Sequence, residues 1–333
     1  MSETHAIISK TYTLSDGRVI PAVGFGAMQH GMVFPGEERP KVIETFKKAI
    51  LAGYRFIDTA PGYGTEDLLG TAIRASGVPR SEFTVITKLA STHHHDPETS
   101  LRESLAKLDV GYIDIFLLHW PNASGPDGRW RNIDESPTFV ETYKKMEKLV
   151  GPECRSIGVC NFSQKTMEVL LKECTIKPVV NEIEVHPFNP NLKLVPYCLE
   201  NGIRVVSWGP LGGGPKSHYF DTSPVYNHPI LTSLASRYNV SIGLIIISWL
   251  VQRGIVPIPH SASPARMDEN LHPVFLTEEE VEQINNMHKQ IGQRRLTDSV
   301  EFLWGDAPGK GYAIMGWTLQ EMGWVDAEGN VLD

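Results

Sequence analysis

The run YRFID, residues 54–58, is a short β-prone segment that stops on Asp58, and six later runs repeat its plan. Each run is apolar, ends on or carries a residue capable of chemistry, and precedes a polar or glycine-rich stretch and then a segment with helical periodicity. The other six runs carry Lys88, His119, Asn161, Glu182, Trp208 and His260. The C-terminal ends of the strands of a (β/α)8 barrel converge on one mouth, where the active site lies. The serial pattern therefore predicts an α/β protein, a (β/α)8 TIM barrel.

We predict a single barrel domain over residues 1–333, with an N-terminal β-hairpin at 8–20 and a C-terminal tail at 290–333. The hairpin follows from two short alternating strands joined by Ser-Asp-Gly. The tail holds tryptophans at 304, 317 and 324 and is too apolar for a free linker, so we expect it to pack over the barrel mouth or side. A long loop at 121–137 leaves the catalytic end, and loops of this length are usually functional.

Composition narrows the classes of function. A chain of 333 residues with 41% hydrophobic residues buries a large core, and its net charge of −8 argues against nucleic acids or anionic membranes as partners. The sequence contains no apolar run of about 18 residues, which a membrane span needs. The N-terminus has no signal or transit pattern, and the four cysteines lack metal or disulfide spacing. We expect a cytoplasmic protein with reduced thiols.

Four residues near the predicted mouth form a set suited to carbonyl reduction: Asp58, Tyr63, Lys88 and His119. A phenol has a pKa near 10, and a neighbouring ammonium such as Lys88 should lower that pKa. Asp58 would pair with Lys88, and His119 would hydrogen-bond a carbonyl oxygen. These groups supply a proton and stabilise an oxyanion, but none forms a covalent intermediate, so a separate hydride source is required.

Several ordered blocks carry a resemblance to a known family. They read GYRFIDTAPGYGTED, VITKL, DIFLLHWP, IGVCNF, VVNEIEVHPF and VVSWGPLG. The chain resembles the aldo-keto reductases of the NADP-dependent aldehyde, xylose and glycerol reductase type. The resemblance implies a monomeric (β/α)8 barrel that binds NADP(H) extended, without a Rossmann fold. It also implies that Tyr63 is the general acid in the reduction of an aldehyde, ketone or sugar to an alcohol.

The same resemblance assigns the cofactor contacts by matching position. Asn161 and Glu182 would hold the nicotinamide carboxamide, and Trp208 would stack under the ring. The adenosine end would lie at the segment that follows the last strand. The full expected set is Cys160, Asn161, Glu182, Trp208, Gly209, Leu211, His260, Ser261, Arg266, Glu269 and Asn270.

Four of these positions depart from the family pattern. Cys160 replaces a serine, Glu182 replaces a glutamine, and Trp208 replaces a tyrosine while keeping a stacking face. His260 stands where many members carry a lysine on the 2′-phosphate, so we expect a softened preference for NADPH and leave NAD(H) as a second cofactor. Arg266 would still hold the phosphate through two hydrogen bonds.

The expected substrate pocket also differs from the family. Met28 and Ala90 stand where aromatic residues are frequent, while Trp120 is retained. A roomier and more adaptable pocket follows, because methionine adjusts to varied ligands. We expect a small carbonyl or alcohol as the partner, but its identity does not follow from the sequence.

Two other functions deserve comparison. A non-catalytic, NADP(H)-binding barrel used as a redox sensor is the main alternative, and the complete set of four residues favours the enzyme. The hypothesis of a metal-dependent barrel hydrolase is supported only by the run from His93 to His95. Three adjacent histidines do not all face one ion from a regular backbone, so we expect a solvated loop there and no metal. For Arg129 and Arg131 we likewise favour a solvated loop over an anchor for an anionic substrate.

Overall fold

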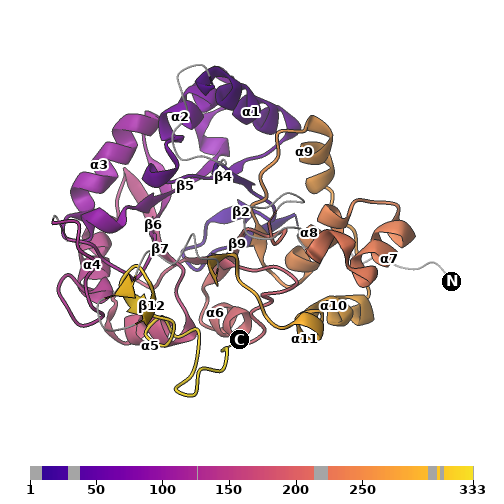
Figure 1. Cartoon of the computed structure of the whole chain (residues 1–333). Coiled ribbons are helices and arrows are strands. Elements are labelled where there is room, and N and C mark those ends of the chain that lie inside the picture. Colours follow the sequence, from indigo (N-terminus) through magenta and orange to yellow (C-terminus); the bar gives the residue numbers. More distant parts are fainter. Residues whose placement is uncertain are drawn as a thin grey trace.

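The computed structural model describes residues 10–28, 38–125, 127–213, 224–298, 306–307 and 311–332. Eight strands form one sheet in which every neighbouring pair with an assigned register is parallel and the strand order follows the sequence. Figure 1 looks into the resulting barrel, with the helices around it. The strands are β3 (Phe25–Gly26), β4 (Phe56–Asp58), β5 (Thr84–Leu89), β6 (Ile113–Leu118), β7 (Cys154–Cys160), β8 (Val180–Glu184), β9 (Arg204–Trp208) and β10 (Val256–Pro257).

The sheet closes between β10 and β3, and two prolines shape this seam. The backbone N–H of Gly24 donates to the oxygen of Pro257 at 2.9 Å, and that of Gly26 donates to Pro259 at 3.3 Å. Proline has no N–H, so it accepts these bonds without returning one. The closed eight-stranded arrangement confirms the predicted (β/α)8 barrel.

Helices connect successive strands on the outside of the barrel. Thr138 and Thr277 each form a capping box with the glutamate three residues later, at the starts of α4 and α10. The helices are α1 (Arg39–Ala52), α2 (Glu66–Ala75), α3 (Pro97–Leu108), α4 (Phe139–Met146), α5 (Gln164–Glu173), α6 (Leu194–Glu200), α7 (Pro229–Tyr238), α8 (Ile242–Gln252), α9 (Pro264–Asn270), α10 (Glu278–Asn285) and α11 (His288–Ile291).

Among the described residues, no single helix has the length and apolar character to cross a bilayer. The pair α7 and α8 reaches the required length only together, across a bend of 93°. Residues 244–251 of α8 are buried in the protein.

Alternating residues of the strands fill the barrel interior. They form one buried cluster that includes Phe56, Ile86, Leu117, Val180 and Val206. Successive side chains of a strand point to opposite faces, so the residue two positions further along points inward as well, nearer the C-terminal mouth. This rule places Asp58, Lys88, His119, Glu182 and Trp208 at the mouth.

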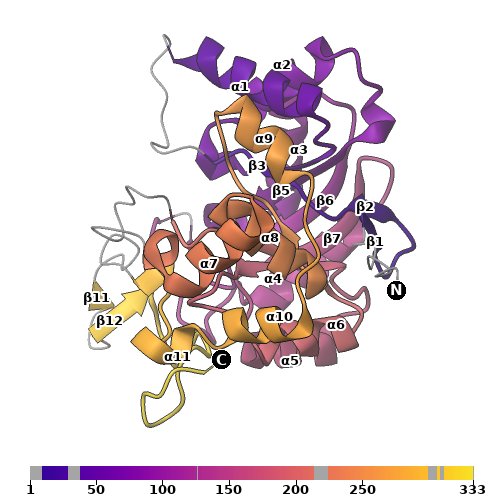
Figure 2. The ribbon, with the colours of Figure 1, turned by 90° about the vertical axis from the view of Figure 1, so that its right-hand side faces the viewer.

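The hairpin and the tail lie at opposite ends of the barrel, as Figure 2 shows. Strands β1 (Thr11–Thr13) and β2 (Val19–Pro21) form the hairpin. Leu14, just after β1, and Ile20, in β2, join the interior cluster. Residues 8 and 9, included in the predicted hairpin, lie outside the described residues.

The tail packs beside the loop that follows β6. It contains the short strands β11 (Asp306–Ala307), β12 (Gly311–Ile314) and β13 (Trp317–Thr318). The amide of Asn122 donates to the oxygen of Ile314 at 3.0 Å, and the indole of Trp317 donates to that of Arg131 at 2.9 Å. Trp317 is buried and contacts the ring of Phe139. These contacts agree with the expected packing, although Trp304 lies outside the described residues.

Candidate active site

Four predicted residues meet at the mouth: Asp58 ends β4, Lys88 lies in β5, His119 follows β6 and Tyr63 ends the short helix η1 (Pro61–Tyr63). The ammonium of Lys88 forms a fully buried ion pair with Asp58. It also donates to the carbonyl oxygen of Thr59 and to the hydroxyl of Tyr63, both at 3.2 Å. Because Lys88 is the donor to this hydroxyl, the proton of Tyr63 is left to point elsewhere.

The pKa values of Tyr63 and Lys88 differ in part from the prediction. Burial raises the pKa of Tyr63, and Lys88 acts in the predicted direction by lowering it without overcoming burial. The predicted net decrease is therefore wrong for this structure, because low-polarity surroundings disfavour the phenolate. Burial acts to lower the pKa of Lys88, but Asp58 and Glu182 outweigh it, so the pKa lies well above its ordinary value. Lys88 is thus a permanent cation.

His119 is a neutral hydrogen-bonding group. Burial, followed by the charge of Lys88, holds the pKa of His119 well below its usual value. Its ring meets that of Tyr63 edge-on, with centroids 6.0 Å apart. Both side chains are only half-buried, so a small molecule at the mouth could reach them. A neutral imidazole there donates a hydrogen bond without competing for the proton of Tyr63.

Asn161, directly after β7, is bonded to His119, which follows β6, and to Trp208 of β9. Its backbone is left-handed, with φ of 62°, a conformation that asparagine tolerates better than most residues. Its amide nitrogen donates to the oxygen of His119 at 3.0 Å and contacts the sulfur of Cys160 at 3.2 Å. Its oxygen accepts from the indole of Trp208 at 2.9 Å. Asn161 therefore fixes the edge of Trp208, and only its oxygen keeps capacity for a further bond.

Glu182 occupies a position that sequence reasoning only partly anticipated. The prediction placed it on a carboxamide, but one of its carboxyl oxygens lies 3.1 Å from the ammonium of Lys88. Its side chain is fully buried. The alternation of inward and outward side chains along β8 predicts that Glu182 points into the barrel, since it lies two residues after the interior Val180. Its nearness to Lys88 depends on the barrel's curvature and stagger, which the sequence does not reveal.

The expected adenosine-end residues gather where β10 leads into α9. The imidazole of His260 donates to the oxygen of Gly26 at 2.9 Å, and its ring is exposed. The exposed guanidinium of Arg266 donates to the hydroxyl of Ser261 at 3.3 Å. Glu269 accepts from the backbone of Ser241. Asn270 is buried at the end of α9.

The loop after β9 holds the two remaining predicted cofactor contacts. Gly209 has φ of 56°, and a Cβ there would lie 2.9 Å from Leu296, so glycine is needed at this turn. Leu211 is partly buried and packs against the main core.

The expected substrate-pocket residues differ in exposure. Met28 is 43% exposed, Ala90 is half-buried and Trp120 is buried. The ring of Trp120 contacts His119 and also Trp324, both with centroids 6.5 Å apart. The tail that carries Trp324 was expected to pack over the mouth or side of the barrel, but its contact with Trp120 was not predicted, because no local pattern shows where a tail returns.

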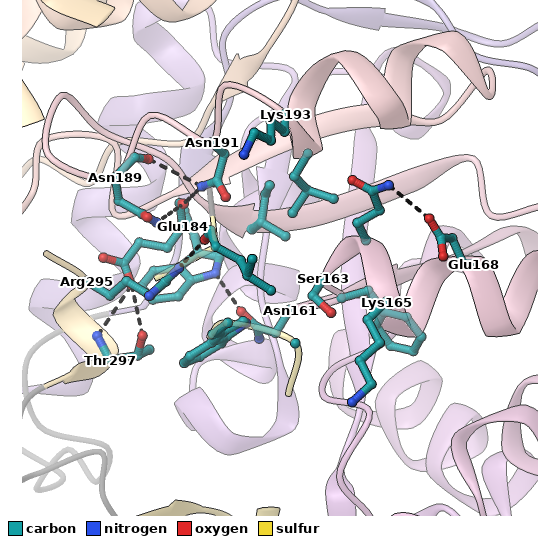
Figure 3. Close-up of a pocket in the computed structure, with 18 residues that line it drawn as sticks. Asn161, Ser163, Lys165, Glu168, Glu184, Asn189, Asn191, Lys193, Arg295 and Thr297 are labelled. Atoms are coloured by element: carbon teal, nitrogen blue, oxygen red, sulfur yellow. Dashed lines mark hydrogen bonds between the residues drawn. The ribbon is translucent and has the colours of Figure 1, made fainter. Parts of the chain in front are cut away.

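A cavity of about 340 Å³ lies beside the cluster, between the loops after β7 and β8 and the tail. Asn161 and Trp208 form one wall of it, and Arg295 and Trp324 contribute from the tail. Figure 3 shows the carboxylate of Glu184 bonded to Thr297 on the tail side. The cavity does not include Tyr63 or His119, so it adjoins the four-residue set rather than containing it.

The histidine run corrects one expectation. His94 is completely buried, and burial lowers its pKa to about 3, so the predicted solvated loop is wrong at this position. The rings of His93 and His95 stack with centroids 6.2 Å apart. Among the described residues, no group of three or more His, Cys, Asp or Glu side chains is arranged to hold a metal ion. In the loop after β6, Arg129 pairs with Glu135.

Comparison with known proteins identifies the family. The aldo/keto reductase family model matches residues 22–289. The chain belongs to the aldo/keto reductase family. It is 35% identical to glycerol 2-dehydrogenase (NADP(+)) of Saccharomyces cerevisiae over 310 residues, covering 86% of this chain and 94% of the yeast protein.

Two further relatives extend the comparison. Aldo-keto reductase family 1 member A1 of Gallus gallus is 34% identical, covering 83% of this chain and 88% of its own. The crystal structure of a Bombyx mori aldo-keto reductase in complex with NADP matches with a TM-score of 0.77 and 35% identity, covering 88% and 97% of the two chains.

Proposed function

We propose that this protein reduces a small aldehyde, ketone or sugar to an alcohol with NADPH, and that Tyr63 donates the proton. The observation that carries the proposal is the ammonium of Lys88, which bonds Asp58 and the hydroxyl of Tyr63 at once. A fixed cation beside a phenol favours its loss of a proton, as a general acid requires.

The residues around the mouth suit NADP(H). Neither carboxyl oxygen of the buried Glu182 completes a hydrogen bond within the described part of the chain, so a carboxamide would find a partner beside Asn161. Trp208 is half-buried, with an indole edge fixed by Asn161, and its face would support a nicotinamide ring. Arg266 would hold a 2′-phosphate. NAD(H) is a weaker second cofactor, because His260 supplies less attraction than a lysine.

Each catalytic residue then has one task. The bound cofactor supplies the hydride. Tyr63 gives its proton to the carbonyl oxygen while Lys88, held by Asp58, stabilises the developing phenolate. Neutral His119 donates a hydrogen bond to the same oxygen and orients the carbonyl. Met28 and Ala90 leave room for substrates of differing shape.

The proposal also covers the compartment and the oligomeric state of the protein. All four cysteines are free thiols, which suits a cytoplasmic protein. The resemblance to the family implies a monomer, and we propose that state for this protein.

Consumption of NADPH in the presence of a panel of aldehydes, ketones and sugars tests the proposal, with NADH assayed in parallel. We expect turnover with at least one carbonyl and faster turnover with NADPH. Tight binding of NADPH without turnover of any carbonyl would favour the redox-sensing alternative instead.

A further inference from the structure

Glu182 is a buried ionisable residue beside the ion pair of Asp58 and Lys88. An ammonium has three N–H groups, and those of Lys88 point to Asp58, to the oxygen of Thr59 and to the hydroxyl of Tyr63. One carboxyl oxygen of Glu182 lies 3.1 Å from the same nitrogen, as a fourth neighbour of a group that has only three protons. Within the described residues, both of its oxygens are buried and lack a hydrogen bond. A carboxylate in this position would be attracted by the ammonium but poorly solvated.

The charges of the cluster do not balance if both carboxyl groups ionise. Asp58 and Glu182 face a single cation, Lys88, and all three side chains are almost completely buried. An uncompensated charge in such a site is costly, so one carboxyl group retains a proton. Lys88 lies closer to Asp58 than to Glu182, and the contact between the two carboxyl groups acts to lower the pKa of Asp58 and to raise that of Glu182. The proton consequently resides on Glu182.

The neighbouring titratable groups do not supply the missing positive charge. Burial raises the pKa of the Cys160 thiol well above its ordinary value, and burial raises that of Tyr63, so both are neutral. His119 is neutral as well. Burial, followed by the charge of Asp58, raises the pKa of Glu182 to about 8, with Lys88 opposing them.

We propose that Glu182 is a positioning residue that carries a proton at neutral pH and, by losing it in the alkaline range, weakens Tyr63 as a proton donor. While Glu182 is neutral, the influence of Lys88 on the pKa of Tyr63 is opposed by burial and by the charge of Asp58. When Glu182 ionises, its negative charge makes the phenolate of Tyr63 harder to form. A glutamine at position 182 has no proton to lose in this pH range, so it would not make the acid strength of Tyr63 depend on pH. The catalytic part of this inference rests on the proposed function, whereas the protonation does not.

Equilibrium unfolding at several pH values tests the protonation without any cofactor. The unfolded chain loses the Glu182 proton near the ordinary pKa of 4.5, but the folded chain keeps it up to about pH 8. Between these values the folded state binds one more proton, so stability falls as pH rises. This one group should raise the unfolding constant by up to about tenfold per pH unit.

The variant Glu182→Gln should lack that part of the pH dependence. Glu103→Gln, the same change on an exposed carboxyl group of α3, should keep it. Equal pH slopes for wild type and Glu182→Gln would overturn the inference. If Glu182→Gln does not fold, the carbon-13 shift of the Glu182 carboxyl in wild-type protein replaces it. A midpoint near 8 supports the inference, and a midpoint near 4.5 contradicts it.

The pH dependence of kcat for carbonyl reduction tests the coupling to Tyr63. From pH 7 to pH 9 the wild-type kcat should fall by up to about tenfold, as the neutral form of Glu182 is lost. Glu182→Gln should show little of this decline, and Glu103→Gln should follow the wild type. Parallel wild-type and Glu182→Gln profiles would refute the coupling. A wild type inactive at every pH would contradict the proposed function, while the unfolding result would still decide the protonation.

Discussion

At the scale of single residues, the two largest influences on the acid strength of Tyr63 oppose each other. Burial favours the neutral phenol, and the ammonium of Lys88 favours the phenolate. The sequence predicts the influence of Lys88, because a neighbouring ammonium always acts to lower the pKa of a phenol. It does not predict the influence of burial, because burial depends on how completely the surrounding strands close over the site.

Replacing Lys88 by methionine should affect both catalysis and stability. Loss of the ammonium removes the influence that lowers the pKa of Tyr63, so kcat should fall by about 10²–10⁴-fold. Asp58 is then left buried without its partner, and breaking such a pair costs about 3–5 kcal/mol. Turnover and denaturant unfolding measure the two effects, with Lys107→Met on the outer helix α3 as the control. Unchanged turnover in Lys88→Met would exclude its role beside Tyr63.

Replacing His260 by lysine should tighten NADPH binding relative to NADH. A charge-assisted contact with the 2′-phosphate contributes roughly 1.5–3 kcal/mol, or about ten- to a hundredfold in affinity. NADH lacks this phosphate and should gain almost nothing. Dissociation constants for both cofactors provide the measurement.

A protonated His260 in the wild type would itself bind the 2′-phosphate. In that case wild-type affinity for NADPH should weaken as pH rises through roughly 6–7, where an imidazole loses its charge. Measurement at one pH below and one above this range separates the cases. Equal cofactor affinities in wild type and His260→Lys at both pH values would show that this side chain does not face the phosphate.

At the scale of strands and helices, alternation along each strand determines which residues reach the mouth. Asp58 and Lys88 lie two residues after the interior Phe56 and Ile86, so their location follows from the sequence once the strands are recognised. The seam between β10 and β3 does not follow in this way. Pro257 and Pro259 accept hydrogen bonds from β3 across it, and a proline in a strand usually argues against a central position.

Helix α2 depends on a close approach at Gly70. A Cβ at this position would lie 1.8 Å from the backbone oxygen of Leu108, at the end of α3. Gly70→Ala should therefore destabilise the protein by about 1–3 kcal/mol through overpacking, despite the better helix propensity of alanine. Gly243→Ala, in helix α8, is the control because its Cβ would meet only ordinary contacts. Equal unfolding free energies for the two variants would show that α2 shifts without cost.

At the scale of the whole molecule, serial strands and family blocks predict the barrel and the aldo/keto reductase family, and both are confirmed. The roles of the site residues remain predictions. The sequence could not locate contacts that join distant segments: Trp324 against Trp120, the burial of His94, and Glu182 beside Lys88. Each depends on packing between elements, which no local periodicity encodes.

The turnover of Tyr63→Phe with NADPH and a carbonyl that the wild type reduces tests the central claim most directly. The change removes one hydroxyl group and keeps the ring, so NADPH should bind with nearly its wild-type dissociation constant. Carbonyl reduction should fall by about 10²–10⁴-fold, because the proton donor is gone. Tyr197→Phe, on the outer helix α6, should retain full activity. A Tyr63→Phe protein that keeps more than half of the wild-type kcat would contradict Tyr63 as the general acid.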